Sequence, residues 1–263
     1  MESSINSLKV FTSGHKENPS IIFIHGFPFD HSMWNNQVEE LKDKYFCVTY
    51  DVRGLGASPA GDGQYTLESF VDDLESIIQM LKLNSPVLCG LSMGGYISLR
   101  ALERIPNKFK AAILCDTRSE SDTNEGKLKR AAAIKLINTN GVKEFASGFV
   151  PNCFSENFMK HNSDIYLAIV ERSMASNPIA VKGCLLAMSG RTDTSSSLST
   201  LKIPVLVLCG DDDKLTPPSV MKSMADKIPA SKFSIVPNAG HMSPVENPDF
   251  VNKQINSFLA SII

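Results

Sequence analysis

The sequence predicts an α/β fold built on a mostly parallel β-sheet. Short apolar runs alternate with helical patterns of ten to fifteen or so residues, which is the rhythm of strands joined by right-handed crossovers. The runs are apolar throughout, as in strands that are covered by helices on both faces. The 263 residues, 43% of them hydrophobic and 21% charged, are enough for one large domain with an insertion.

The first part of the chain contains most of the predicted sheet. The clearest helix is 66–83, because apolar residues from Leu67 to Leu81 fall on one stripe and Thr66 can cap its N-terminus. In chain order, we expect an outer strand at 8–12, a buried strand at 21–24, a helix at 30–42 capped by Asp30, a strand at 46–50, the helix at 66–83, a strand at 86–90, a helix from 96 to about 104 and a strand at 109–115.

The character of the chain changes between residues 117 and 200. Strand-like runs stop, and four short helices are expected at 127–137, 142–150, 164–175 and 178–188. Such a helical insertion is expected to lie over the sheet edge as a cap. The sheet resumes with a strand at 205–209, a helix around Met221, a strand at 233–236 and a helix at 248–259. We therefore predict a core in two parts, 1–116 and 201–263, with the cap at 117–200.

Charge and composition narrow the class of partner. A formal net charge of −2, with no run of Lys or Arg, argues against nucleic acid and anionic membranes and favours a small molecule. The first residues lack a signal-peptide pattern and no apolar run approaches a membrane span, so we expect a cytoplasmic protein. The six cysteines show no metal-ligand spacing, and we expect buried thiols and neither metal nor organic cofactor. The oligomeric state stays open.

The stretch 90–95, Gly-Leu-Ser-Met-Gly-Gly, predicts a nucleophile. It lies between an apolar run and a helical pattern, so Ser92 is expected at the apex of a sharp strand-to-helix turn. The flanking glycines let the backbone adopt strained dihedral angles and let strand and helix approach closely. The pattern alone is weak, since a chain of this length contains one by chance about once in ten.

A base and an acid follow downstream in the order Asp, His. A serine oxygen needs a base to take its proton, and a histidine does this best when a carboxylate orients it. His241 and Asp213 each follow a predicted strand, as Ser92 does, and the carboxyl ends of parallel strands meet at one crevice. Asp213 is preferred over its neighbours 211 and 212 because it comes just before the turn into a helix, while Asp116, which also ends a strand, is the alternative acid.

Two backbone N–H groups are candidates for stabilising an oxyanion. One belongs to Met93, at the start of the helix after Ser92, and the other to Phe27, in the loop after the strand at 21–24. Pro28 has no N–H to offer. His25 is interpreted as a structural hydrogen-bonding residue of the same loop.

These motifs together resemble the α/β-hydrolase superfamily: 25–28 (His-Gly-Phe-Pro), 51–58, 90–95, 210–217 and 240–241. The resemblance implies an eight-stranded, mostly parallel sheet with a helical cap after the sixth strand, and it supports Asp213 as the acid. Serine at the turn speaks against the dehalogenases and epoxide hydrolases of this fold, which use aspartate there.

Within the superfamily, the stretches 90–95, 115–118 and 122–126 resemble 3-oxoadipate enol-lactonases and related small esterases. Such lactones carry a free carboxylate, which a cap arginine such as Arg118 or Arg130 could bind. Arg118 and Trp34 are the candidate substrate contacts. The predicted function is hydrolysis of a small ester or lactone through an acyl-enzyme. C–C bond hydrolysis, cofactor-free perhydrolysis and ligand sensing by the same fold are the alternatives.

Overall fold

The computed structural model describes residues 1–262 and is built around one eight-stranded sheet of order β1-β2-β4-β3-β5-β6-β7-β8. The strands are β1 (Glu2–Ile5), β2 (Leu8–Ser13), β3 (Ser20–Ile24), β4 (Phe46–Tyr50), β5 (Val87–Leu91), β6 (Ala111–Cys115), β7 (Val205–Gly210) and β8 (Ser231–Val236). β1 and β2 pair antiparallel, and every pairing from β4 to β8 is parallel. The predicted mostly parallel sheet is confirmed.

The outer strand expected at 8–12 is present as β2, but the sequence did not predict the further strand β1 outside it. β2 lies between β1 and β4, and β1 forms the edge. The sequence of β1 shows no strand pattern, because three of its four residues are polar and only Ile5 is buried. An edge strand of this kind is held by its backbone hydrogen bonds to β2 and needs little apolar surface of its own.

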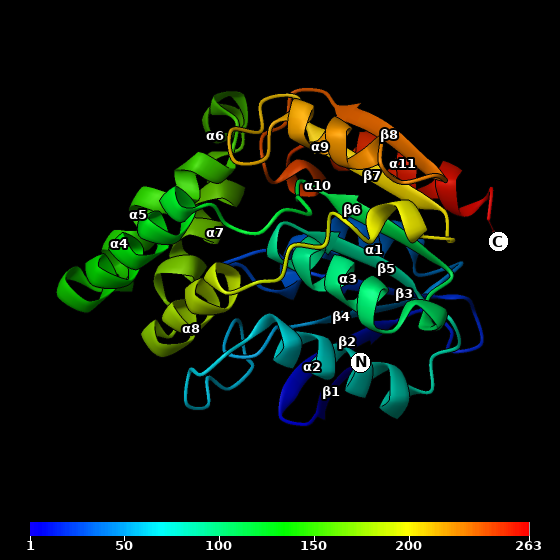
Figure 1. Ribbon diagram of the computed structural model, residues 1–263, viewed down its shortest axis with the longest axis horizontal. Helices are drawn as coiled ribbons and strands as arrows, with labels where there is room; N and C mark the ends of the chain where they lie inside the picture. The colour runs from blue at the N-terminus through cyan, green and yellow to red at the C-terminus, as the bar shows by residue number, and fades with distance from the viewer. Residues whose placement is uncertain (263) are drawn as a thin grey trace.

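Helices cover both faces of the sheet (Figure 1). They are α1 (Asn35–Leu41), α2 (Leu67–Leu81), α3 (Met93–Arg104), α4 (Asn124–Asn140), α5 (Val142–Phe149), α6 (Glu156–His161), α7 (Ser163–Met174), α8 (Pro178–Ser189), α9 (Pro218–Ala225), α10 (Ser243–Glu246) and α11 (Pro248–Leu259), with 3₁₀ turns at η1 (His31–Trp34), η2 (Pro106–Lys108), η3 (Val150–Cys153) and η4 (Leu198–Thr200).

The helix ends follow local chemistry where a capping residue is present. Thr66 caps α2 by accepting the N–H of Ser69, as expected, and Asp30 caps η1 by accepting the N–H of Ser32. α3 begins at Met93, three residues before the expected start, so its first turn contains Gly94 and Gly95. α6 and α10 were not expected, because six and four residues are too few to show a helical period.

Two hydrophobic cores lie on opposite faces of the sheet. Strand β3 contributes to both: Ile22 and Ile24 pack in one cluster, and Ile21 and Phe23 pack in the other. All five residues of β3 are buried. Because side chains of β3 point alternately into the two cores, its residues 21–24 are all apolar.

Helices α4 to α8 form an insertion between β6 and β7, and Figure 1 shows them gathered on one side of the sheet. The described residues contain no helix that is both long and apolar enough to cross a membrane. All six cysteines are buried free thiols, as expected. The last residue of the predicted second core part, 263, lies outside the described residues.

Candidate active site

Ser92 occupies a strained turn between β5 and α3. Its backbone angles are φ 53° and ψ −113°, and its N–H donates to the Cys115 carbonyl at 3.0 Å. Gly94 allows this turn, because a Cβ there would lie 2.1 Å from the carbonyl oxygen of Ile24. The hydroxyl of Thr117 donates to the Ser92 carbonyl at 2.8 Å. The backbone N–H and carbonyl of the half-buried Ser92 are therefore both held by the end of β6 and the residues after it.

The structure brings Asp213 and His241 together. The Nδ1 atom of His241 lies 2.9 Å from Oδ2 of Asp213, and both side chains are almost fully buried. The hydroxyl of Thr216 donates to the same Oδ2 at 2.5 Å and lies 3.3 Å from His241 Nδ1. Sequence reasoning missed Thr216, although its place three residues after Asp213, before Pro217, is that of a residue which closes a turn on a carboxylate.

Asp213 stays ionised in spite of its burial. Burial alone raises the pKa of a carboxyl group, but the attraction of His241 and the hydrogen bonds from His241 and Thr216 outweigh it and lower the pKa of Asp213 to about 2. A carboxylate only accepts hydrogen bonds, so His241 must carry its proton on Nδ1 to donate to it. That tautomer leaves the lone pair on Nε2, where a base needs it.

Asp116, the alternative acid, has other partners. Its Oδ1 accepts the N–H of Gly210 at 2.8 Å and its Oδ2 accepts the hydroxyl of Ser243 at 2.5 Å. Burial raises the pKa of Asp116 well above its usual value, and the nearby charge of Asp213 raises it further. Asp116 therefore ties the end of β7 to the segment after His241. Asp211 likewise accepts the backbone N–H groups of Asn238 and Ala239.

The loop after β3 lies directly against the Ser92 turn. A Cβ at Gly26 would be 3.4 Å from Ser92 Cβ. The fully buried His25 shapes this loop through backbone contacts, since its Nδ1 lies 2.8 Å from the Gly26 carbonyl and its Nε2 accepts the N–H of Val52 at 2.9 Å. Burial lowers the pKa of His25, in keeping with a neutral structural ring. Phe27 follows in this loop, with its N–H in no backbone hydrogen bond among residues 1–262.

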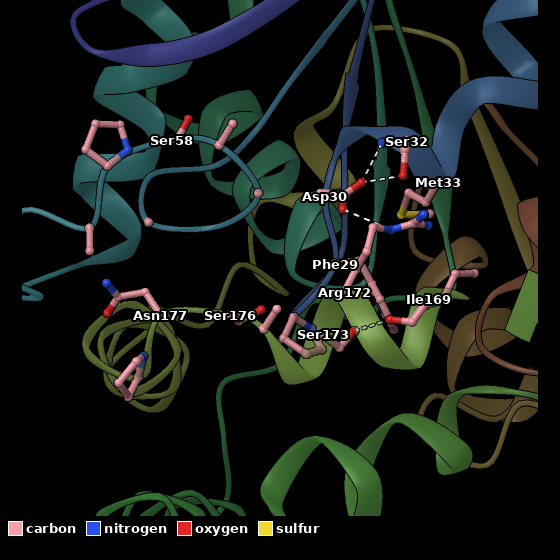
Figure 2. A pocket seen from close by; sticks show the side chains of 18 residues that line it. Phe29, Asp30, Ser32, Met33, Ser58, Ile169, Arg172, Ser173, Ser176 and Asn177 are labelled. Atoms are coloured by element: carbon pink, nitrogen blue, oxygen red, sulfur yellow. Dashed lines mark hydrogen bonds and ion pairs between the residues drawn. The ribbon is translucent and has the colours of Figure 1, made fainter. Parts of the chain in front are cut away.

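A cavity of about 590 Å³ opens beyond this loop, between the core and the insertion. Figure 2 shows Asp30, Ser32 and Met33 on one side and Arg172 of α7 reaching toward Asp30. Its walls are formed by three segments: 28–33 after β3, 54–60 after β4, and 169–178 of α7 and α8. None of the three predicted triad residues lines it. The cavity begins at Pro28, one residue beyond the predicted oxyanion donor.

Arg172 differs from the other arginines of this region. The Arg118 guanidinium donates to the Leu215 carbonyl at 2.5 Å, while Arg130 and Arg191 both bind Asp122. Arg172 makes one loose ion pair, with its Nε 3.4 Å from Asp30 Oδ2, and its side chain is 51% exposed. The structure therefore places Arg172 at the cavity. The sequence singled out Arg118 and Arg130, and no local pattern distinguishes Arg172 from them.

Trp34 is not at the cavity. Its side chain has no exposed surface and its ring packs 5.3 Å from that of Phe23 in the core beneath the sheet. A substrate contact of the tryptophan would require the core to open. Its predicted role as a substrate contact has no support in this arrangement.

Two groups of side chains have the spacing of metal ligands. They are Asp30, His31 and Asp51, and Asp116, Cys209 and Asp213. In the first group Asp51 accepts hydrogen bonds from His31 and from the Ala57 N–H. In the second, both carboxylates have the hydrogen-bond partners described above. The carboxylates of both groups therefore already make hydrogen bonds within the protein.

Comparisons with known proteins identify the family and the fold. A family model described as the alpha/beta hydrolase fold matches residues 19–248. The chain is similar to a thermophilic esterase from Thermogutta terrifontis, with 31% identity, a TM-score of 0.94, and coverage of 100% of this chain and 99% of the esterase. For the enol-lactonase from Burkholderia xenovorans LB400 the values are 25%, 0.91, 99% and 100%.

A similar relative by sequence is 3-oxoadipate enol-lactonase 1 of Acinetobacter baylyi, which is 27% identical over 256 residues, with 97% of this chain and 94% of the relative covered. The chain belongs to the α/β-hydrolase fold family. The predicted superfamily is thereby confirmed, and the protein is a hydrolase of that family.

Proposed function

We propose that this α/β-hydrolase cleaves a small carboxylic ester or lactone through an acyl-enzyme formed on Ser92. The observation that carries the proposal is the hydrogen bond between His241 and the ionised Asp213, which leaves Nε2 as the basic nitrogen. Ser92, Asp213 and His241 all follow strands that run parallel, so they project from the same edge of the sheet.

In the proposed mechanism His241 Nε2 takes the Ser92 proton as the hydroxyl attacks the carbonyl carbon. The N–H groups of Phe27 and Met93 stabilise the oxyanion, and the imidazolium then gives its proton to the leaving oxygen. A water molecule, activated by the same nitrogen, hydrolyses the acyl-enzyme. No step needs a metal ion or an organic cofactor.

The part of the substrate away from the scissile bond would lie in the cavity. A volume of about 590 Å³ suits a small ligand. The exposed guanidinium of Arg172 favours a substrate with a carboxylate, which supports an enol-lactone or a half-ester of a diacid. In this proposal the insertion acts as the cap, with the core formed by 1–116 and from 201 onward.

The proposal is tested by turnover of p-nitrophenyl acetate and of 3-oxoadipate enol-lactone by the wild type and Ser92→Ala. Lactone opening that is lost in the variant supports both the nucleophile and the lactonase. Acetate cleavage without lactone opening keeps the serine esterase and rejects the lactonase. An absence of turnover of either substrate by the wild type would overturn the proposal in favour of ligand binding.

A further inference from the structure

One carboxylate links the insertion to the loop that carries His241. Glu246 is the last residue of α10, and its Oε1 accepts the N–H of Met242 at 3.1 Å. Its Oε2 accepts the N–H of Ser155 at 2.8 Å. Met242 adjoins His241, whereas Ser155 is the cap residue of α6 in the insertion. One side chain therefore joins the loop after His241 to Ser155, which lies 91 residues before Glu246 in the sequence.

The backbone around this carboxylate is closely packed. A Cβ at Gly240 would lie 2.7 Å from the Ser155 nitrogen and 3.2 Å from Glu246 Oε1. The N–H of Met242 also donates to the Cys153 carbonyl at 3.1 Å. Segment 153–155 thus lies directly against Gly240 and Met242, the two neighbours of His241. A shift of this segment therefore displaces the backbone on both sides of His241.

Both oxygens of Glu246 accept a backbone N–H, so this position needs two acceptor atoms on one side chain. Burial raises the pKa of Glu246, and the hydrogen bonds of the Gly240, Ser155 and Met242 N–H groups act against this rise. A glutamine of the same shape would turn an NH₂ group toward an N–H donor and lose that contact. The site therefore distinguishes carboxylate from amide.

We propose that Glu246 is a positioning residue that sets the orientation of His241 according to the placement of the insertion. The inference rests on the proposed function, in which His241 is the base. The segment after His241 is held to the core by the hydrogen bond from the Ser243 hydroxyl to Asp116. Glu246 holds the same segment to the insertion. A displacement of segment 153–155 would then misalign the imidazole.

Ser155 provides a matched pair of variants. Its backbone angles, φ −69° and ψ 148°, suit proline, and so do those of Phe154 before it, φ −120° and ψ 151°. Ser155→Pro removes the N–H that Glu246 accepts. Ser155→Ala keeps that N–H. Both variants equally lose the hydroxyl that caps α6 by accepting the N–H of Phe158. Glu246→Gln changes the acceptor of the same hydrogen bond and leaves the Ser155 N–H in place.

Two readouts separate positioning from a structural role. We expect Ser155→Pro and Glu246→Gln to lower kcat for p-nitrophenyl acetate by about tenfold to a hundredfold with KM within about twofold, and Ser155→Ala to keep kcat within about threefold of the wild type. The NMR resonance of the His241 Nδ1 proton, which reports its hydrogen bond to Asp213, is expected in the wild type and Ser155→Ala and to shift or broaden in the other two.

An unchanged kcat and an unchanged resonance in Ser155→Pro and Glu246→Gln would overturn the inference, as would a raised KM at constant kcat. A wild type that hydrolyses no ester would reject the proposed function alone, because the resonance still tests the position of His241. Thermal unfolding of the wild type and the three variants identifies any variant that fails to fold. If Ser155→Pro or Glu246→Gln does not fold, the other of these two variants tests the inference.

Discussion

Asp213 and His241 are joined by a 2.9 Å hydrogen bond between Oδ2 and Nδ1, across 28 residues of sequence. Asp116, within 4.8 Å of Asp213, has no part in that bond and accepts hydrogen bonds from Gly210 and Ser243. Two buried carboxylates of the same site therefore have different tasks, and five predictions follow from this and the neighbouring contacts.

Asp213→Asn is expected to lower kcat for the ester by about 10³- to 10⁴-fold, because an amide can leave His241 in the wrong tautomer. Asp116→Asn should cost less than about tenfold, since the asparagine oxygen can still accept one of the two hydrogen bonds. Steady-state kinetics of the two variants side by side check the assignment. A larger loss in Asp116→Asn would transfer the role of acid to that residue.

Ser92→Ala and His241→Ala should each reduce kcat by several orders of magnitude, and the double variant should be little worse than either single one. Residues that act as a unit lose their joint contribution when one of them is removed. The measurement is kcat for the same ester in all three variants. Losses that multiply in the double variant would show that the two residues act independently.

Acid should destabilise the wild type more than Asp213→Asn. Burial disfavours the Asp213 carboxylate, but His241 and Thr216 lower its pKa to about 2. The unfolded chain protonates this group near its ordinary pKa of about 3.9, so its contribution, on the order of 2 kcal/mol, is complete above about pH 4 and is lost as the pH falls toward 2. Urea unfolding between about pH 5 and 2 should give a flatter pH dependence for the variant. Parallel curves would contradict the lowered pKa.

Gly94→Ala is expected to destabilise the fold by more than about 3 kcal/mol or to prevent folding, because the new Cβ would lie 2.1 Å from the backbone oxygen of Ile24. Gly148→Ala is the control. Gly148 lies in α5 with nothing within 4 Å of a Cβ, so alanine should be neutral or stabilise by up to about 1 kcal/mol. Chemical unfolding measures both variants. Equal stabilities would contradict the close approach of α3 to β3.

Arg172→Gln should lower kcat/KM about tenfold for p-nitrophenyl hemisuccinate and leave p-nitrophenyl butyrate unchanged, since only the first ester carries a carboxylate for the cavity. Arg118→Gln is the matched arginine control. Its guanidinium holds the Leu215 carbonyl in the loop of Asp213, so it should affect the two esters alike. A selective loss in Arg118→Gln would return the substrate contact to the residue that the sequence favoured.

Burial and periodicity in the sequence are sufficient to predict the sheet class, most element positions and the pattern of motifs. The buried strand β3 is apolar from residue 21 to residue 24, and α2 shows its apolar stripe and its cap, so burial and periodicity are visible without coordinates. The glycines around Ser92 also reveal the turn, because few other residues could pack there. The family resemblance was confirmed by the family model that matches residues 19–248.

Which polar groups meet follows only from the packing of the whole chain. Asp116 and Asp213 both follow strands. Only the register of β6, β7 and β8 places His241 beside Asp213 and Ser243 beside Asp116. The sequence analysis proposed Arg118 as a substrate contact, but in the fold its guanidinium binds the Leu215 carbonyl. Arg172 lines the cavity, and the sequence analysis had not singled it out. Hydrogen bonds and ion pairs depend on ångström distances between distant segments, and such distances arise only when the whole chain has packed.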